Sequence, residues 1–300
     1  MSKIFRIISN KFPSKDITKE DLKNKLILVS KKKKIEIKLN SKFLLKKNNL
    51  AIIAGPNGVE NIDMMFKTVN FLVKQKINFI RGHVFKPLTF PYRSKIYSES
   101  GFKGLDWMDE IKRYYKNISF VTEVTEIKYL ERILLTSDIL QIGSRNMQNF
   151  ELIKEVAQSK KTIILKRHFG SSLRDFLAAA EYILVENNSN LILCERGVVA
   201  PHTHRVTSRF MLDIQGIVAL KELTNYPVIS DPSHASFWAP WVEKLALASV
   251  ASGCDGLIIE VHPNPRLSKV DPLQALNFNE FKKLKNKILG LCKLLQKKVI

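Results

Sequence analysis

The amino-acid sequence predicts an α/β fold, a (β/α)8 TIM barrel in which eight parallel strands alternate with helices. Past residue 48, short β-branched runs alternate with longer amphipathic stretches, as in the βα units that build a parallel sheet. The eight runs spread over about 210 residues, near the repeat of roughly 30 residues expected when such a barrel occupies about 250. The predicted strands are Leu50–Ala54, Asn78–Arg81, Ile118–Thr122, Asp138–Ile142, Thr162–Leu165, Leu191–Cys194, Pro227–Ser230 and Gly256–Glu260.

Two helices between these strands are clear from the pattern. Residues Asn61–Lys76 carry Met, Val, Phe and Leu on one side, and residues Trp241–Ser252 are rich in Ala and Leu. Each follows a predicted strand, so each fits the helix of a βα unit.

A β-hairpin is expected ahead of the barrel. Residues Lys34–Leu39 alternate polar and apolar side chains, and Phe43–Leu45 could form the return strand, which would cap the floor of the barrel. A short helix is expected over Lys19–Leu26. We therefore predict two parts, a basic N-terminal extension with the hairpin over residues 1–48 and the barrel, which carries the chemistry, over residues 49–300.

The composition is that of a globular, enzyme-sized chain. Its 300 residues are 45% hydrophobic and 26% charged, which excludes disordered and fibrous classes. The sequence contains no apolar run of membrane-spanning length and no signal-peptide pattern at its N-terminus. Cys194, Cys254 and Cys292 are odd in number and widely spaced, so they form neither a disulfide framework nor a CxxC metal site. We expect no membrane partner and a cytoplasmic location.

The formal net charge is +21, which raises the question of a nucleic-acid partner. Residues 1–50 hold 15 Lys and Arg against four acidic residues, an excess of eleven, and the remaining excess is mostly lysine. We interpret the charge chiefly as a solvated basic face. The alternatives are a field that attracts an anionic substrate and, as the least favoured, nucleic-acid binding by the N-terminal 50 residues.

Basic side chains collect just after several predicted strands. The chemistry of a barrel gathers at the C-terminal ends of its strands. The cations at these ends are Arg81, Lys86, Arg145, Lys166 and Arg196. Together with His234 and Glu260 they predict a site for a compound with two negative groups, such as a small phosphorylated acid. The alternative is that the cations form rim ion pairs with carboxylates, and the candidates are Glu123, Glu195, Asp231 and Glu260.

A series of motifs occurs at these strand ends in a fixed order. The motifs are Ala54-Gly55-Pro56-Asn57, Arg81-Gly82, Lys86-Pro87, the string QIGSRNMQNF over 141–150, Leu165-Lys166-Arg167, CERG over 194–197, DPSH over 231–234 and EVHP over 260–263. Together they resemble the type I DAHP synthase and KDO 8-phosphate synthase superfamily, and they are closest to the DAHP synthase branch. The resemblance runs from about residue 50 to residue 276.

The resemblance implies a transferase of aromatic amino acid biosynthesis, in the shikimate pathway. Such enzymes condense phosphoenolpyruvate with erythrose 4-phosphate or arabinose 5-phosphate and release a 3-deoxy-ulosonate phosphate and inorganic phosphate. It also implies the phosphoenolpyruvate site, with Arg81 and Lys86 near the carboxylate and Arg145, Lys166 and Arg209 around the phosphate. Members of the family are commonly dimers or tetramers, so we expect a homo-oligomer.

The metal site of the metal-dependent relatives is altered here. They use Cys, His, Glu and Asp, and the matching positions are Asn57, His234, Glu260 and Asp271. An Asn offers only a neutral amide oxygen, whereas the thiolate it replaces is a far better ligand for such a metal. We therefore expect no obligatory metal, and at most a weakly bound divalent ion. Asn57 and Asp271 would hydrogen-bond the acceptor or the attacking water, and His234 and Glu260 would move protons. Lys86 or His234 would polarise the aldehyde.

The acceptor loop also departs from the family pattern. Related enzymes follow Lys-Pro with a string that includes an Arg for the phosphate of the aldose, whereas here Pro87 is followed by Leu88 and Thr89. Leu88 cannot bind phosphate. We expect the acceptor to meet Pro87, Thr89, Asp271 and Arg93, with Arg93 replacing the missing cation unless the acceptor lacks a phosphate there.

Three readings of the function follow. The leading reading is a DAHP synthase-like condensation of phosphoenolpyruvate with an aldose, either erythrose 4-phosphate or the different acceptor of a specialised pathway. The second, prompted by Asn57 and Leu88, is a barrel that binds phosphoenolpyruvate without turnover. The third is nucleic-acid binding by the N-terminal segment.

Overall fold

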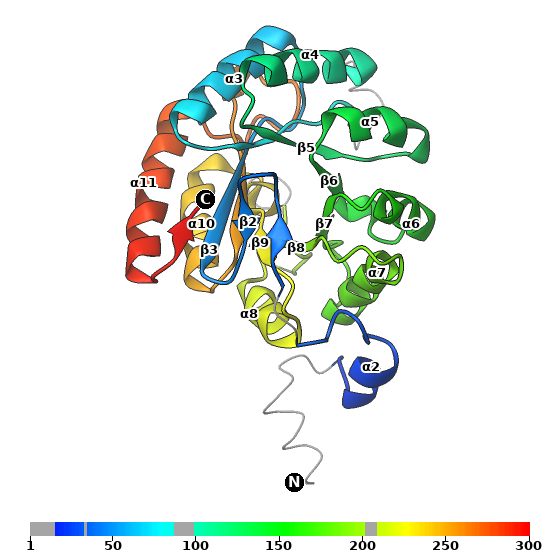
Figure 1. Ribbon diagram of the computed structural model, residues 1–300. Helices are drawn as coiled ribbons and strands as arrows, with labels where there is room; N and C mark the ends of the chain where they lie inside the picture. The colour runs from blue at the N-terminus through cyan, green and yellow to red at the C-terminus, as the bar shows by residue number, and fades with distance from the viewer. Residues whose placement is uncertain (1–15, 33–34, 87–98, 202–208) are drawn as a thin grey trace.

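The computed structural model describes residues 16–32, 35–86, 99–201 and 209–300. Within these residues eight parallel strands close into a barrel, as predicted, because the last strand pairs along its whole length with the first (Figure 1). The barrel strands are β3 (Asn49–Gly55), β4 (Phe79–Arg81), β5 (Ser119–Glu123), β6 (Ile139–Ile142), β7 (Thr162–Lys166), β8 (Leu191–Glu195), β9 (Val228–Ser230) and β10 (Gly256–Glu260). Each lies on one of the predicted apolar runs.

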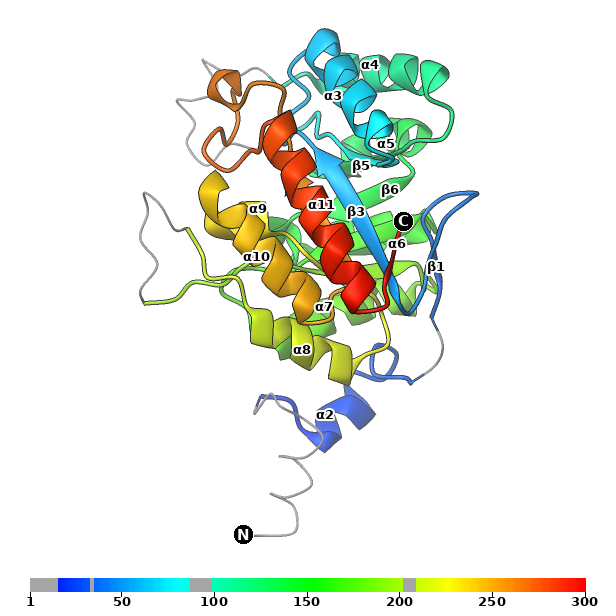
Figure 2. The same ribbon diagram turned by 90° about the vertical axis from the view of Figure 1, so that its left-hand side faces the viewer.

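Helices surround the strands on the outside of the barrel (Figures 1 and 2). They are α3 (Ile62–Lys74), α4 (Gly101–Tyr114), α5 (Leu130–Thr136), α6 (Phe150–Gln158), α7 (Leu173–Val185), α8 (Ile214–Leu223), α9 (Pro232–Ser236), α10 (Ala239–Ala251) and α11 (Phe278–Leu294). The helices predicted over Asn61–Lys76 and Trp241–Ser252 are α3 and α10. Single 3₁₀ turns occupy 127–129, 144–146 and 265–267.

Alternation along each strand sorts the apolar side chains into two cores. Ile53, Val121, Ile164 and Ile258, from four different strands, belong to a small cluster inside the barrel. The intervening residues, such as Ile52, join the larger cluster between the strands and the helices. Parallel strands buried on both faces need continuous apolar sequence, which explains why the runs were visible in the sequence.

The predicted hairpin closes the end of the barrel where the strands begin. Its strands, β1 (Ile37–Lys38) and β2 (Leu44–Leu45), pair antiparallel, and the side chains of Ile37 and Leu45 join the inner core. The Phe43 ring packs edge-on against Phe79, at the start of β4, with centroids 5.6 Å apart. The hairpin therefore fills the opening that the strand starts leave. The final strand β11 (Lys298–Val299) lies beside β3 at the same end.

The remaining described part of the extension lies against the outer helices. Helix α2 (Lys19–Asn24) coincides with the helix predicted over Lys19–Leu26, and Asp21 receives a hydrogen bond of 2.8 Å from Arg174 of α7. Glu181, also on α7, accepts backbone N–H bonds of 2.8 Å from Leu28 and Val29. The division into two parts at residue 48 stays a prediction. None of the helices in the described ranges is long and apolar enough to span a bilayer.

The packing of the hairpin against the end of the barrel can be tested by substitution. Leu45 is fully buried in the inner core, whereas Leu44, beside it on β2, is 38% exposed. We expect Leu45→Ala to lower the free energy of unfolding by about 2–5 kcal/mol, because it leaves a cavity. Leu44→Ala, the matched control, should lower it by less than about 1 kcal/mol. Urea unfolding of the two variants measures both values. Equal losses would contradict the packing of Leu45 in the inner core of the barrel.

Candidate active site

Arg81 lies at the centre of a charged cluster where the strands end. It is the last residue of β4 and is fully buried. Its Nη2 lies 3.2 Å from a carboxylate oxygen of Glu260 and donates to the carbonyl of Gly55, also at 3.2 Å. Gly55 has a φ of +147°, and a Cβ there would lie 2.2 Å from the Arg81 carbonyl oxygen. Only glycine allows β3 to approach β4 this closely, so the position of Arg81 depends on it.

Asp231 joins two of the residues predicted for the site. It follows β9 and caps α9, and one of its oxygens lies 2.9 Å from Nδ1 of His234. The same oxygen lies 2.5 Å from Nζ of Lys166. Burial raises the pKa of this carboxyl group, but His234 and Lys166 outweigh that effect and hold it well below its usual value. Asp231 therefore stays ionised and orients both neighbours.

His234 is neutral in this environment. Burial lowers its pKa to about 3, and the cations Lys166 and Arg81 act in the same direction, although Asp231 opposes them. The contact between Nδ1 and Asp231 places the ring proton on Nδ1. The lone pair of Nε2 then faces the carboxylate of Glu260, 3.9 Å away. His234 can accept a proton at this nitrogen.

Glu260 has an environment suited to a proton carrier. Burial raises its pKa to about 7, while Arg81 opposes the shift. Gln274, which is fully buried, donates from Nε2 to the same carboxylate at 2.5 Å. The carboxyl group can therefore be found in either protonation state near neutral pH.

Asp271 and Asn57 form a pair opposite these groups. Nδ2 of Asn57 donates to Asp271 at 2.6 Å, and Oδ1 of Asn57 is buried with no hydrogen-bond partner among the described residues. Burial raises the pKa of Asp271, but His234, Lys86 and Arg209 outweigh it and lower the pKa below its ordinary value.

Three of the four predicted metal-ligand positions converge. The ligand atoms of His234, Glu260 and Asp271 all lie within 4.8 Å of one another. This set could hold a divalent cation, with Asn57 contributing only its neutral amide oxygen. The donor set is then one imidazole, two carboxylates and an amide oxygen, with no thiolate among them.

Lys86 is held by a carboxylate at the end of β5. Its Nζ lies 3.6 Å from Oε2 of Glu123, which also accepts a hydrogen bond of 3.1 Å from Gln141. His83 accepts the Glu123 backbone N–H at 2.9 Å. Burial, followed by Lys86, Arg81 and other nearby positive groups, keeps the pKa of His83 well below its usual value, so this ring is neutral.

Arginines from the loop after β8 lie beside the cluster. The guanidinium groups of Arg196 and Arg209 lie 4.3 and 5.2 Å from the centre of the Phe210 ring. Burial lowers the pKa of Arg196 to about 10, so the group stays charged, and its Nη1 is buried with no hydrogen-bond partner among the described residues. Burial also lowers the pKa of Arg209, and Arg145 adds to the effect. These cations suit a bound anion.

The structure brings together nearly all of the predicted residues that it describes. Arg81, Lys86 and Lys166 converge, and each is paired with a buried carboxylate, as the ion-pair alternative expected. The anion site stays a prediction. The acceptor residues Pro87, Thr89 and Arg93 lie outside the described residues. The sequence analysis named Asp231 only as a possible ion-pair partner of the cations, which it is for Lys166, and it gave no role to Gln274 or Gln141. Asp231 carries the signal of a residue that follows a strand, whereas Gln274 carries no such signal.

The fold and the cluster define a TIM-barrel protein with a buried, charged site at the C-terminal ends of its strands. A model of the DAHP synthetase I family matches residues 34–297, so the chain belongs to this family.

Individual relatives agree with this assignment. The phospho-2-dehydro-3-deoxyheptonate aldolase of Thermotoga maritima is 36% identical over 248 residues, which cover 83% of this chain and 71% of that protein. The 2-dehydro-3-deoxyphosphooctonate aldolase of Acinetobacter baylyi is 28% identical over 76% of this chain and 83% of its own length.

Solved structures agree as well. The crystal structure of the Thermotoga maritima enzyme superposes with a TM-score of 0.83 and 34% identity, over 89% of this chain and 76% of that one. A truncated form of 3-deoxy-D-arabino-heptulosonate 7-phosphate synthase from the same organism gives a TM-score of 0.83 and 32% identity, over 92% of this chain and all of that one.

The close packing of the Glu123 carboxylate against Gly143 can be tested by adding one methyl group. A Cβ on Gly143 would lie 2.0 Å from Oε1 of Glu123. We expect Gly143→Ala to lower the free energy of unfolding by about 1–3 kcal/mol, because the carboxylate must move. In a Glu123→Ala background the same change should cost less than about 0.5 kcal/mol, and additive losses in urea unfolding would contradict the contact.

Proposed function

We propose that this chain condenses phosphoenolpyruvate with an aldose phosphate, giving a 3-deoxy-ulosonate phosphate and inorganic phosphate. The observation that carries the proposal is the convergence of Arg81, Lys166, Arg196 and Arg209 on one barrel mouth beside the His234 and Glu260 pair. The names of the relatives support the reaction class.

The cations divide between the two anionic groups of phosphoenolpyruvate. Arg81 and Lys86 would hold the carboxylate, and Arg145, Lys166 and Arg209 the phosphate. Arg196 adds a further cation to this second group, because its buried Nη1 has no protein partner in the described part of the chain. Guanidinium groups match the paired oxygens of carboxylate and phosphate.

The chemical steps follow from the groups around the mouth. C3 of phosphoenolpyruvate forms a bond to the aldehyde carbon of the acceptor, and the aldehyde oxygen takes a proton from Lys86. Water adds to C2 and gives a proton to Glu260 or to Nε2 of His234. The bond between C2 and the phosphate oxygen then breaks, the C2 hydroxyl gives its proton to the departing phosphate and becomes the ketone oxygen, and inorganic phosphate leaves. Fixed charges and positioning supply most of the rate acceleration in such an addition.

The reaction would not require a metal ion. His234, Glu260, Asp271 and the Asn57 amide oxygen could hold a divalent ion weakly, and a bound ion would help to polarise the acceptor aldehyde. Asn57 and Asp271 instead form a hydrogen-bonded pair that would position the acceptor or the attacking water.

Erythrose 4-phosphate is the first acceptor to test, with Pro87, Thr89, Arg93 and Asp271 as the proposed contacts. Leu88, where relatives carry a phosphate-binding Arg, favours an acceptor held differently at that end. Assembly into a homo-oligomer and a cytoplasmic location stay predictions.

Release of inorganic phosphate tests the proposal. With phosphoenolpyruvate, erythrose 4-phosphate and excess chelator, we expect release well above the rate without acceptor. Lys166→Met should lower it by roughly 100-fold or more, because a preorganised charge is lost. Lys154→Met, an exposed lysine on α6, is the matched control and should leave the rate unchanged. No release from the unaltered chain, with or without restored divalent metal, across a panel of aldoses would contradict the proposal and favour a barrel that only binds.

A further inference from the structure

A second charged cluster lies just outside the mouth, on the helix side of the barrel wall. Nη1 of Arg167 lies 3.0 Å from a carboxylate oxygen of Glu195 and 2.8 Å from Oδ2 of Asp213. Its Nη2 donates to the carbonyl of Ser171 at 2.9 Å. Arg167, Glu195 and Asp213 are called the Arg167 clip below. The clip ties together the loops after β7 and β8 and the start of α8.

The pleat of the strands explains why the clip lies behind the mouth. Ile164 and Cys194 belong to the inner core of the barrel. By alternation Lys166 and Arg196 also face inward, while Arg167 and Glu195 face the helices. Each of these clip residues is therefore the direct neighbour, along the chain, of a cation of the proposed phosphate site.

Glu195 and Asp213 also join the two ends of the loop between β8 and α8. Oε1 of Glu195 accepts backbone N–H bonds from Gly197 at 2.6 Å and from Asp213 at 3.4 Å. Val198 and Met211 pair across the loop just inside these contacts. The loop carries Arg196 near its beginning and Arg209 near its end. The clip therefore fixes the base of the loop that carries both arginines.

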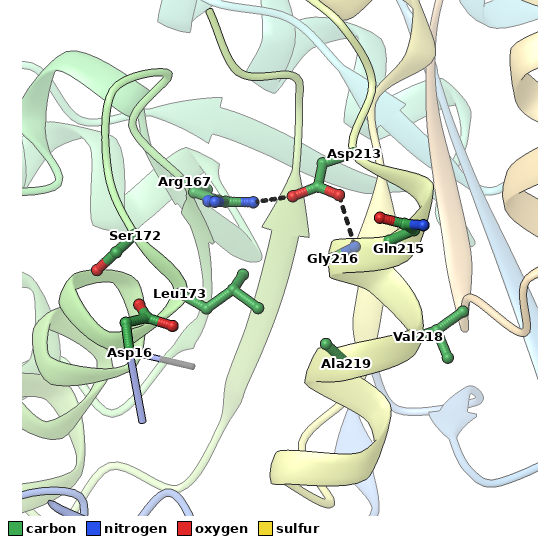
Figure 3. A pocket seen from close by; sticks show the side chains of 9 residues that line it. All are labelled: Asp16, Arg167, Ser172, Leu173, Asp213, Gln215, Gly216, Val218 and Ala219. Carbon is green, nitrogen blue, oxygen red and sulfur yellow. Dashed lines mark hydrogen bonds and ion pairs between the residues drawn. The ribbon is translucent and has the colours of Figure 1, made fainter. Parts of the chain in front are cut away.

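A cavity gives solvent access to the clip from outside. Figure 3 shows both Arg167, which follows β7, and Asp213, at the start of α8, on its wall. The cavity has a volume of about 620 Å³ and is lined by Asp16, Arg167, Ser172, Leu173, Asp213, Gln215, Gly216, Val218 and Ala219.

We propose that the Arg167 clip positions the cations of the phosphate site, Lys166, Arg196 and Arg209. This inference rests on the proposed function. The clip holds the two ends of the loop at a fixed distance, so that both arginines and Lys166 meet one phosphate group at the same time. Without the ion pair, the three cations would keep their charges but would no longer be aligned on one phosphate group.

Asp213 lets the positioning role be separated from simple helix capping. Its Oδ1 accepts the Gly216 N–H at 2.6 Å and caps α8, while its Oδ2 contacts Arg167. An Asn at this position keeps an oxygen for the cap but turns an amide N–H toward Arg167. Ser172 is the matched control, because it caps α7 on the same cavity and does not contact the clip.

The test uses the full chain, with phosphoenolpyruvate as substrate and inorganic phosphate as competing product. We expect Asp213→Asn to raise the KM for phosphoenolpyruvate and the Ki of phosphate together, by roughly 10- to 100-fold, with kcat within about threefold of the unaltered chain. Arg167→Lys should raise both constants too, because a single ammonium nitrogen cannot reproduce the planar fork in which Nη1 meets both carboxylates while Nε and Nη2 donate to the Ser171 carbonyl. Ser172→Ala should leave both constants unchanged, although it lowers the melting temperature.

Three results would overturn the inference. Unchanged constants in Asp213→Asn, with normal turnover in the unaltered chain, would overturn the clip and leave the proposed function standing. Equal rises in Asp213→Asn and Ser172→Ala, in step with their melting temperatures, would show a merely structural role. An unaltered chain that neither binds nor turns over phosphoenolpyruvate would overturn the proposed function and the inference with it.

Discussion

The arrangement of the site depends on the neutralisation of buried cations by carboxylates that are themselves buried. Arg81 and Lys166 lie in a barrel mouth that excludes most water, where an unpaired charge costs several kcal/mol. Glu260 and Asp231 meet them at 3.2 and 2.5 Å. Removal of one partner from such a pair typically costs about 3–5 kcal/mol, so the carboxylates keep the cations inside as well as in place.

This charge balance also sets the protonation states that the proposed reaction needs. The same cations that would bind phosphoenolpyruvate help to keep His234 neutral, and burial brings the pKa of Glu260 to about 7. A neutral imidazole and a carboxyl group that titrates near neutral pH then lie 3.9 Å apart. Binding and proton transfer are thus two consequences of one buried network.

The sequence predicted the fold well because barrel strands leave a strong local signal. Runs such as Gly256–Glu260 are apolar on both faces. Arg81, Lys166 and Glu260 end or directly follow such runs, and His234 lies in the short helix just after another. Gln274 and the contact between Arg167 and Asp213 were not predictable in this way. They join residues up to 46 positions apart, and only barrel closure and the loop after β8 bring them together. The acceptor side rests on Pro87, Thr89 and Arg93, for which the prediction from sequence stands alone.

The proposed reaction forms a carbon–carbon bond at this mouth with the protein's own residues and without an obligatory metal. The most direct measurement is ¹³C NMR of the product made from phosphoenolpyruvate labelled at C3, with erythrose 4-phosphate and excess chelator. We expect the label to appear as the methylene carbon of a 3-deoxy sugar acid. Label found in the methyl group of pyruvate, or left in phosphoenolpyruvate, would contradict it.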